Sequence, residues 1–371
     1  MKLKFDLLLI VAALIPNIHP VLAQTTNLSI APSGNQTVLF WPTTIANYVL
    51  QSTTNLSSTN WVVVTNAVLV TAVTVTNTSP NRYFRLQITS NTAPTNGMAF
   101  IPAGSFTMGD SLDGGSDATP TVVTASAFYM DTNLVNNSQW VAVLSWALNY
   151  GYSFDDDGAA KATNHPVQTV NWYDVVKWCN ARSLLAGLVP VYYTDTNFTQ
   201  IYTNGDVDAV NANWAANGFR LPTEAEWEKA ARGGAVGLRF PWGNTISESQ
   251  ANYYSNTNLC SSCSSYDLGP SGYNATFTSG GPPYTSPVGS FAANGYGLYD
   301  MAGNALEWCW DWYGTPYVGG TDPRGPASGG VRILRGGSWS GLASVQRCGY
   351  RNDAPPNSAD YSIGFRCVRS P

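Results

Sequence analysis

The pattern of hydrophobic and polar residues differs between the two parts of this chain. Between about residues 28 and 88, short runs rich in Val and Thr, such as 62–65 (VVVT) and 73–76 (VTVT), are separated by Ser, Asn and Pro. Short β-branched runs bounded by turn residues indicate strands. Because no helical period occurs here, residues 24–89 are predicted to form a small all-β module, followed by a polar linker at 90–97.

Two segments beyond the linker follow the period of an amphipathic helix. They span residues 137–148 and 172–185. In the first helix we expect four residues to form the inward stripe: Trp140, Val141, Leu144 and Leu148. In the second helix we expect three residues to face the core: Val175, Val176 and Cys179.

A third helix is predicted from its two ends. Thr223 is a good N-cap, and Glu226, three residues later, completes a capping box with it. Gly233 and Gly234 then supply the left-handed conformation that commonly ends a helix. We expect a helix of about ten residues here.

The rest of the C-terminal part has strand and turn signals but few helical ones. Residues 98–109 (MAFIPAGSFTMG) predict a strand, a turn and a second strand. Residues 192–209 predict a hairpin that turns at Asn204 and Gly205. The remainder is rich in Gly and Trp, so residues 98–371 are expected to form one irregular α+β domain.

The first residues have the composition of a secretory signal peptide. Lys2 and Lys4 form a short basic region, residues 7–15 are almost wholly apolar, and Ala23 is the small residue that precedes a cleavage site. The apolar run is too short to cross a bilayer, and no later stretch reaches that length. We expect residues 1–23 to be removed and the mature chain, without a transmembrane segment, to be secreted, periplasmic or at the cell surface.

Charge and cysteine usage narrow the function classes. Charged residues are only 11% of the chain, the formal net charge is −5, and no cluster of Lys and Arg occurs. This composition argues against nucleic acids and anionic membranes as partners, since both attract basic patches. All six cysteines lie beyond the predicted signal peptide and so belong to the mature chain. An exported chain enters an oxidising compartment, which favours disulfides.

Six motifs in a fixed order carry a resemblance to a known family. They are HPVQTVNWYDVVKWCN (165–180), GFRLPTEAEWEKAARGG (218–234), FPWGN (240–244), NGYGLYDMAGNALEW (294–308), RGGSW (335–339) and GFRCV (364–368). Together they resemble the sulfatase-modifying-factor, or formylglycine-generating enzyme, family over nearly everything after Gly97. The resemblance implies a C-type-lectin-like α+β fold, and members of this family oxidise a sulfatase cysteine to formylglycine with copper(I) held by two thiolates.

The copper thiolates of that family have no counterpart here. The first aligns with Gly341, and the second falls in a shorter stretch without cysteine, whereas Cys348 matches a structural cysteine. Copper(I) is a soft ion that requires both sulfur ligands, so copper is not expected. Ser338 matches a serine near the reacting centre of the family and is the one catalytic candidate.

Other catalytic metal sites are also disfavoured. Iron-dependent relatives use three histidines, and the mature chain would contain only His165. A Ser-His-Asp site with a spare base is excluded for the same reason. Residues 155–158 (DDDG) are interpreted as an acidic turn, because the spaced ligands of a calcium loop do not follow them.

The resemblance does imply a calcium site. The carboxylates of Asp300 and Glu307 and the backbone carbonyls of Gly303 and Ala305 match calcium ligands of the family, and calcium prefers such oxygen ligands. A capped turn without an ion is the alternative. A second family site would use Asn252 and Tyr253, but its acidic ligand aligns near Gly280, so we give that site less weight.

The same resemblance implies a disulfide between Cys179 and Cys367. Cys309 and Cys348 are then expected to pair, and Cys260 with Cys263 would close a small loop. A redox-active C-x-x-C pair usually stands at the start of a helix, and no helical pattern follows Cys263. We therefore favour structural closure of this loop over redox chemistry.

Two functions from different classes follow. The first, which we prefer, is a non-catalytic or chemically divergent domain that binds an extended peptide or a glycan. The peptide or glycan could belong to another exported protein. The second is a formylglycine-generating oxidase or a related metal-dependent oxygenase that modifies an exported protein.

Overall fold

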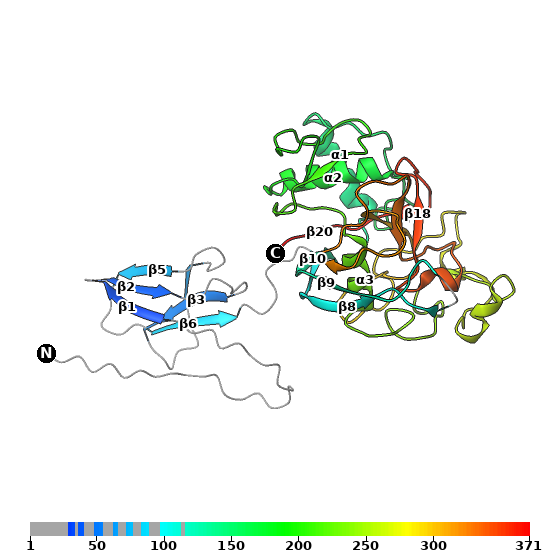
Figure 1. Ribbon diagram of the computed structural model, residues 1–371, viewed down its shortest axis with the longest axis horizontal. Helices are drawn as coiled ribbons and strands as arrows, with labels where there is room; N and C mark the ends of the chain where they lie inside the picture. Colours follow the sequence, from blue (N-terminus) through cyan, green and yellow to red (C-terminus); the bar gives the residue numbers. More distant parts are fainter. Residues whose placement is uncertain are drawn as a thin grey trace, which may run out of the picture. The chain divides into compact units, whose positions relative to one another are not determined.

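The computed structural model describes residues 29–33, 36–40, 48–54, 62–65, 72–76, 83–88, 97–112 and 116–371. It divides into two compact units, residues 1–95 and residues 96–371 (Figure 1). The expected signal peptide at 1–23 and all but the last residue of the expected linker at 90–97 lie outside the described residues.

The N-terminal unit contains two three-stranded antiparallel sheets. One sheet has the order β1 (Ser29–Ser33), β2 (Gln36–Phe40), β5 (Ala72–Thr76), and the other has the order β4 (Val62–Thr65), β3 (Tyr48–Thr53), β6 (Tyr83–Ile88). The Val- and Thr-rich runs of the sequence therefore form strands, as their β-branched composition predicts.

The C-terminal unit has three larger sheets and two short hairpin ladders. The larger sheets are β20 (Val368–Arg369), β10 (Phe128–Asp131), β7 (Met98–Ile101); β16 (Gly320–Thr321), β9 (Thr121–Ala125), β8 (Gly104–Met108); and β18 (Asn352–Ala354), β17 (Arg332–Arg335), β15 (Leu306–Trp312), β19 (Ile363–Gly364). The ladders are β11 (Tyr192–Tyr193) with β12 (Asn211–Ala212), and β13 (Tyr254–Ser255) with β14 (Gly272–Tyr273). The two strands of 98–109 exist as predicted, but they pair with different partners, β7 with β10 and β8 with β9.

Three α-helices lie among these strands, each where the sequence predicts it: α1 (Asn137–Leu148), α2 (Trp172–Leu185) and α3 (Glu224–Arg232). Thr223 and Glu226 form the predicted capping box, and Gly233 ends α3 with φ 57°. Short 3₁₀ helices add η2 (Ser261–Ser265), η3 (Ala275–Phe277) and η4 (Ala343–Gln346). This unit is therefore α+β, with α1 and α2 packed together and α3 against the strands (Figure 1).

Two details of the prediction are wrong. In α1, Val143 and Ala147 are buried with Trp140 and Leu144, whereas Val141 and Leu148 are 46% and 56% exposed. The reason is helical geometry: Trp140, Val143, Leu144 and Ala147 are spaced i, i+3, i+4, i+7 and share one face, whereas Val141 and Leu148 lie outside that face.

The hairpin after β11 turns earlier than expected. Its turn is at Asp195, whose carboxylate accepts hydrogen bonds from the backbone N–H groups of Thr199 and Gln200, 3.0 and 2.7 Å away. The bridge between Tyr193 and Ile201 follows directly. An Asp side chain that caps its own turn competes well with an Asn-Gly turn signal.

Helix α3 carries a buried network of ion pairs. Glu224 binds Arg351 and Arg335, with shortest distances of 2.7 and 3.3 Å, and Glu228 binds Arg335 and Arg232 at 2.5 and 2.6 Å. Arg335 also donates through Nη2 to the backbone carbonyl of Cys348, 2.6 Å away. We call these five side chains the α3 ion network. It joins the end of β17 to the far end of the loop that follows it.

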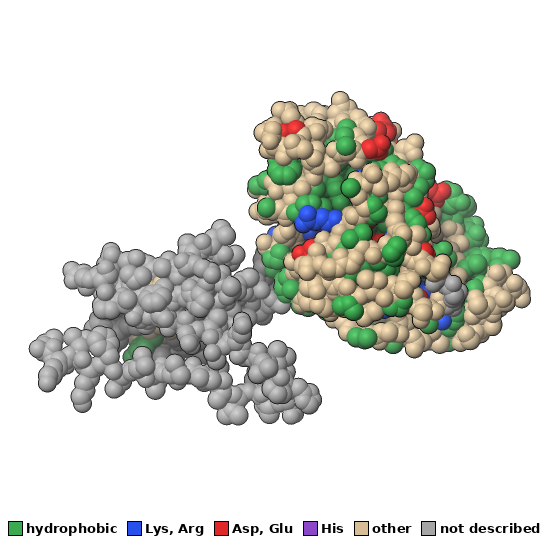
Figure 2. Space-filling model, in the orientation of Figure 1, with side chains coloured by type: hydrophobic (Ala, Val, Ile, Leu, Met, Phe, Trp, Pro, Cys, Tyr) green, Lys and Arg blue, Asp and Glu red, His purple; other side chains and the backbone are tan. Residues whose placement is uncertain are grey.

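Charged side chains are few on the visible face of the C-terminal unit, where uncharged polar groups and apolar side chains predominate (Figure 2). Among the described residues, no helix has the length and hydrophobicity needed to span a bilayer.

Candidate functional site

The loop after β17 contains the positions that align with the copper-binding segment. Gly336 and Gly337 have φ of 91° and 69°, and they turn the chain out of the strand into the segment Ser338–Leu342. Gln346, at the end of η4, extends its side chain back under this segment. Its Nε2 donates to the carbonyl oxygens of Ser338, Gly341 and Leu342 at 3.1, 2.9 and 3.3 Å.

A side chain at the position of the first thiolate would displace Val345 and Gln346 from their present places. A Cβ atom on Gly341 would lie 2.7 Å from Cγ2 of Val345 and 2.9 Å from Nε2 of Gln346. A Cβ atom on Gly337 would lie 2.2 Å from Oε1 of Gln346. The loop is thus built around an amide rather than around two sulfur atoms, and its residues do not fit copper(I).

Ser338 is buried, and its hydroxyl lies 3.1 Å from the hydroxyl of Ser340. His165 bonds through Nδ1 to Oγ1 of Thr285 at 2.9 Å, and burial lowers the pKa of the imidazole. Since a serine nucleophile needs a general base within hydrogen-bond reach, the contacts of Ser338 give it no activation.

Five aromatic side chains lie next to this loop, and we call them the tyrosine–tryptophan cluster. Tyr254 and Tyr273 face each other across the β13–β14 ladder, with ring centroids 4.6 Å apart. Trp339 lies 5.6, 5.2 and 5.7 Å from the rings of Tyr273, Tyr284 and Tyr361. The cluster touches the loop directly, because the backbone N–H of Tyr254 donates to the carbonyl of Gly341 at 3.0 Å.

Two buried polar atoms beside the cluster have no hydrogen-bond partner. They are Nε1 of Trp339 and Oγ of Ser286. Both residues are bound to Asn304: the backbone N–H of Trp339 donates to the Asn304 carbonyl and that of Ser286 to Oδ1, each at 3.0 Å. A buried polar group without a partner costs about 1–3 kcal/mol, so both atoms have hydrogen-bonding capacity that the fold leaves unused.

In the expected calcium loop, one carboxylate oxygen is available to bind an ion. Asp300 is buried, its Oδ2 accepts from the backbone N–H of Gly289 at 2.7 Å, and its Oδ1 has no partner. Burial raises the pKa of Asp300 to about 6. An unpartnered buried carboxylate oxygen fits a cation, and the neighbouring carbonyls of Gly303 and Ala305 are the hard oxygen donors that calcium takes.

Glu307 has a different environment. Its carboxylate binds Arg366 through two hydrogen bonds of 2.7 and 2.8 Å and accepts a third from Nε1 of Trp227 at 2.9 Å. The Arg366 guanidinium already neutralises its charge. An ion in this loop would therefore rely on Asp300 for charge.

At the second expected calcium site, to which we gave less weight, Asn252 forms hydrogen bonds with the loops around it. Its side-chain Nδ2 donates to the carbonyl of Tyr284 at 2.8 Å, and its own carbonyl accepts from the N–H of Asn304 at 2.9 Å. The hydroxyl of Tyr253 donates to Asp267 at 2.5 Å. Asn252 thereby connects Asn304 and Tyr284, and so the calcium loop and the tyrosine–tryptophan cluster.

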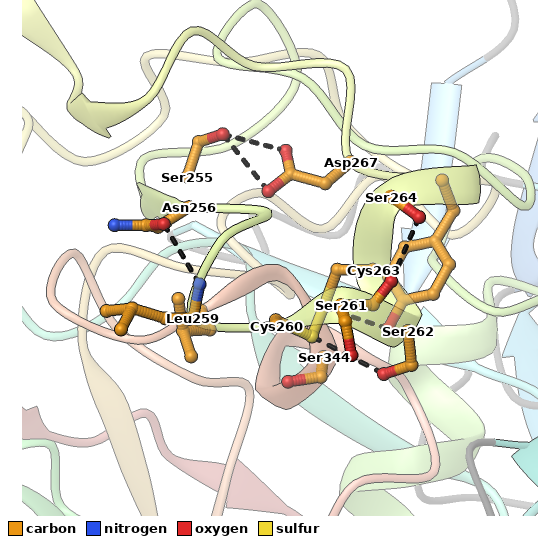
Figure 3. Close-up of a disulfide and its surroundings, with 12 residues drawn as sticks. Ser255, Asn256, Leu259, Cys260, Ser261, Ser262, Cys263, Ser264, Asp267 and Ser344 are labelled. Carbon is orange, nitrogen blue, oxygen red and sulfur yellow. Dashed lines mark hydrogen bonds between the residues drawn. A yellow bond between two sulfur atoms is a disulfide. The ribbon is translucent and has the colours of Figure 1, made fainter.

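The cysteines differ in part from the expected pairing. Cys260 and Cys263 form a disulfide, and Ser344 lies beside it (Figure 3). The segment after Cys260 is the 3₁₀ helix η2, where we expected no helix. The disulfide expected between Cys179 and Cys367 is not formed: the two are adjacent thiols whose Sγ atoms are 3.5 Å apart, beyond the length of a disulfide bond.

Cys309 and Cys348 do not form the expected bond, and both are buried thiols. Both pack in the same apolar cluster, with Trp227 and Ile333, and burial raises the pKa of both thiols. A thiol whose pKa is raised is less reactive towards oxidation.

Sequence reasoning missed Gln346 and the tyrosine–tryptophan cluster. The high aromatic content was the available signal, but the rings come from five segments between residues 254 and 361, and no local pattern connects them. Gln346 lies after the RGGSW motif and not within a motif, so no sequence signal identified it as a functional residue.

Comparison with known proteins agrees with the motifs. Residues 84–371 match the model of the sulfatase-modifying factor enzyme 1-like domain. The chain is 32% identical over 278 residues to the serine/threonine-protein kinase pkn1 of Chlamydia caviae, covering 73% of this chain but only 38% of that protein's length. It is 32% identical over 309 residues to the formylglycine-generating enzyme of Thermomonospora curvata, covering 74% of this chain and 94% of that enzyme.

A solved structure gives the same result. Treponema denticola variable protein 1 is 32% identical, with a TM-score of 0.57, over 74% of this chain and 95% of that protein. The fold of the C-terminal unit is accordingly the C-type-lectin-like α+β fold of these proteins. This chain belongs to the sulfatase-modifying factor family.

Proposed function

We propose that this chain is an exported member of its family that binds a ligand instead of oxidising a cysteine. The binding surface comprises the loop Ser338–Leu342 and the tyrosine–tryptophan cluster, and its ligand is an extended peptide or a glycan. The observation that carries the proposal is Gln346, which binds three carbonyls of that loop, including that of Gly341 at the position aligned with the first thiolate.

The alternative is a formylglycine-generating oxidase, the activity for which the Thermomonospora relative is named. Such an enzyme needs two thiolates that can approach one copper ion. Of the six cysteines, two form a disulfide and four are buried, so none offers an accessible thiol. The remaining serine, Ser338, cannot replace a soft sulfur ligand.

Native alkylation tests this proposal. The folded, unreduced protein is treated with iodoacetamide and mapped by mass spectrometry, and the same reaction after denaturation serves as the control. We expect no labelled cysteine in the folded protein, because every thiol is buried. Rapid labelling of a cysteine that copper(I) then protects would favour the oxidase instead.

We further propose that the loop Asp300–Glu307 binds calcium for structural purposes. Asp300 supplies the charged oxygen, and the carbonyls of Gly303 and Ala305 supply neutral ones. The unpartnered Oδ1 of Asp300 supports this assignment. In this role the ion would stabilise the turn that also holds Asn304, and through it Trp339 and Ser286.

Thermal unfolding with calcium and with a chelator checks the calcium assignment. Calcium at about a hundred times its Kd adds roughly 2.7 kcal/mol, or roughly 5–10 °C for a domain of this size. Asp300→Asn is expected to abolish that shift, while Asp353→Asn, at an exposed carboxylate, should retain it. An equal response in the chelated and calcium-loaded wild type would contradict the assignment.

Export rests on the basic and apolar pattern of residues 1–23. The expected outcome is a mature chain that begins at Gln24, which N-terminal sequencing of the natural protein measures directly. A mature protein that retains Met1 would contradict it.

A further inference from the structure

We propose that the tyrosine–tryptophan cluster binds a neutral carbohydrate chain. This inference rests on the proposed binding function and names the ligand class for the same surface. The cluster consists of Tyr254, Tyr273, Tyr284, Trp339 and Tyr361.

The cluster differs from the aromatic core in its exposure. Tyr273 and Tyr361 are 41% and 53% exposed, whereas Trp339 between them is 3% exposed. Core rings such as Trp140 and Trp178, which also stack on each other, are completely buried. Two exposed rings on either side of a nearly buried one leave apolar surface that the fold itself does not use.

The surroundings of the rings are polar but almost uncharged. Ser340 is exposed next to Trp339, and the tyrosines contribute their hydroxyls. Among the described residues, the cation over a cluster ring is Lys161, whose Nζ lies 5.7 Å from the centre of the Tyr284 ring and donates to the carbonyl of Phe277, and the exposed Asp360 directly precedes Tyr361. A charged ligand would find little to pair with, so the surface favours a neutral one.

A sugar ring matches both properties. Its axial C–H groups carry a partial positive charge and are attracted to the negative face of an aromatic ring. Its hydroxyls can donate to and accept from tyrosine and serine hydroxyls. Nε1 of Trp339, within the cluster, is buried without a partner, and a ligand hydroxyl that reached it would relieve the cost of its burial.

An extended peptide fits less well. Peptides that bind to a sheet add a strand along a free edge, and main-chain hydrogen bonds supply the affinity. Here β13 and β14 have two residues each and pair with each other. They offer too short an edge for such a ligand.

The test titrates the full mature chain with cellohexaose, mannohexaose, xylohexaose and chitohexaose, followed by calorimetry and tryptophan fluorescence. We expect at least one of these oligosaccharides to bind. Tyr273→Ala and Tyr361→Ala should each weaken that binding about tenfold, because each removes one stacking face. Tyr273→Phe and Tyr361→Phe keep the ring and should weaken it less.

Tyr150→Ala is the matched control. Tyr150 is 63% exposed and stacks on Trp146 at 4.1 Å, outside the cluster. Its loss should change affinity by no more than about twofold. Each variant is first checked for an unchanged melting temperature, so that a loss of binding reports on the ring alone.

Three outcomes would overturn the proposal. They are no binding of any of the four oligosaccharides, binding that survives the Tyr273→Ala/Tyr361→Ala double variant, and binding that chelation of calcium abolishes while the ring variants leave it intact. An additional titration uses a sulfatase-type peptide with serine in place of its cysteine. Ring-dependent binding of that peptide without any oligosaccharide binding would reject the carbohydrate and keep the binding function, whereas formylglycine formation would reject the binding function itself.

Discussion

The α3 ion network holds the two ends of the loop that follows β17 together, the tyrosine–tryptophan cluster includes Trp339 from within that loop, and the two regions are built on opposite principles. In the network, Glu224 and Glu228 are buried and bind three arginines at 2.5–3.3 Å. In the cluster, two rings are 41% and 53% exposed and two buried polar atoms have no partner. In the first region both carboxylates are neutralised by arginines of the same core, with Nε of Arg335 left without a partner, whereas the second region retains exposed ring surface.

This difference separates structural from functional residues better than residue type does. Arginine and glutamate are common in active sites, but here each bonds to another side chain of the same core. Tyrosine and tryptophan are common in cores, but here they are partly exposed and adjoin unpartnered atoms. The network holds Arg335 and Cys348 together at the two ends of the loop, and so positions the surface that remains available.

The largest expected effect is in the network. Glu224→Gln removes the charge that binds Arg351 and one of the two that bind Arg335, so the buried Arg351 loses its charge partner and Arg335 keeps Glu228 alone. We expect a loss of about 3–5 kcal/mol in the free energy of unfolding, measured by urea denaturation. Asp353→Asn, at an exposed carboxylate, is the control and should change it by less than about 0.5 kcal/mol. Equal effects from the two variants would contradict the buried role of the network.

The next effect concerns the amide under the loop. Gln346→Ala removes the donor for the carbonyls of Ser338, Gly341 and Leu342. We expect a loss of about 1–3 kcal/mol, because the freed carbonyls are partly buried. Hydrogen exchange should show faster exchange in residues 338–346 and little change in α1. Gln200→Ala, at an exposed position, should have no measurable effect. Similar unfolding curves for both glutamine variants would show that Gln346 does not hold the loop.

A smaller effect is expected at the Cys260–Cys263 disulfide. A loop this short contributes at most about 2 kcal/mol in the chain-entropy model. The backbone bonds from Cys260 to Asn256 and from Cys263 to Cys260 also hold the loop without the disulfide. Cys260→Ser/Cys263→Ser should therefore unfold only slightly earlier than the wild type. A loss of more than about 3 kcal/mol would show that this disulfide holds more than its own loop.

The smallest effect on stability is expected at the exposed rings. Tyr273→Ala and Tyr361→Ala should each cost less than about 1 kcal/mol, since their rings are largely solvated before the change. Ligand binding, by contrast, should fall about tenfold. A large loss of stability with unchanged binding would reverse the comparison and make the cluster a part of the core.

The sequence predicted the elements whose signals are local. Caps at Thr223 and Gly233 located α3, and helical periods located α1 and α2 at their observed ends. The predicted hairpin turn at Asn204–Gly205 is wrong because Asp195 caps an earlier turn. The predicted inward stripe of α1 is wrong because packing in the folded protein buries Val143 and Ala147 instead.

The candidate site was predicted only in part, for a physical reason. Single positions such as Gly341 and Asp300 could be read from motifs, but what surrounds them could not. Gln346 under Gly341 and Arg366 on Glu307 are contacts made by folding, as is the convergence of three tyrosine rings on Trp339. The prediction of a Cys309–Cys348 disulfide is wrong for the same reason, since an even number of cysteines does not determine which thiols meet in the fold.

The central claim is that the loop built around Gln346 binds rather than oxidises. The most direct measurement is aerobic incubation of the disulfide-intact protein with a sulfatase-type cysteine peptide and copper, read by mass spectrometry. The account predicts no formylglycine above the level without protein, because Gly341 supplies no sulfur and Gln346 occupies the space. Copper-dependent conversion of the peptide that exceeds this level, and that Gln346→Ala alters, would contradict it.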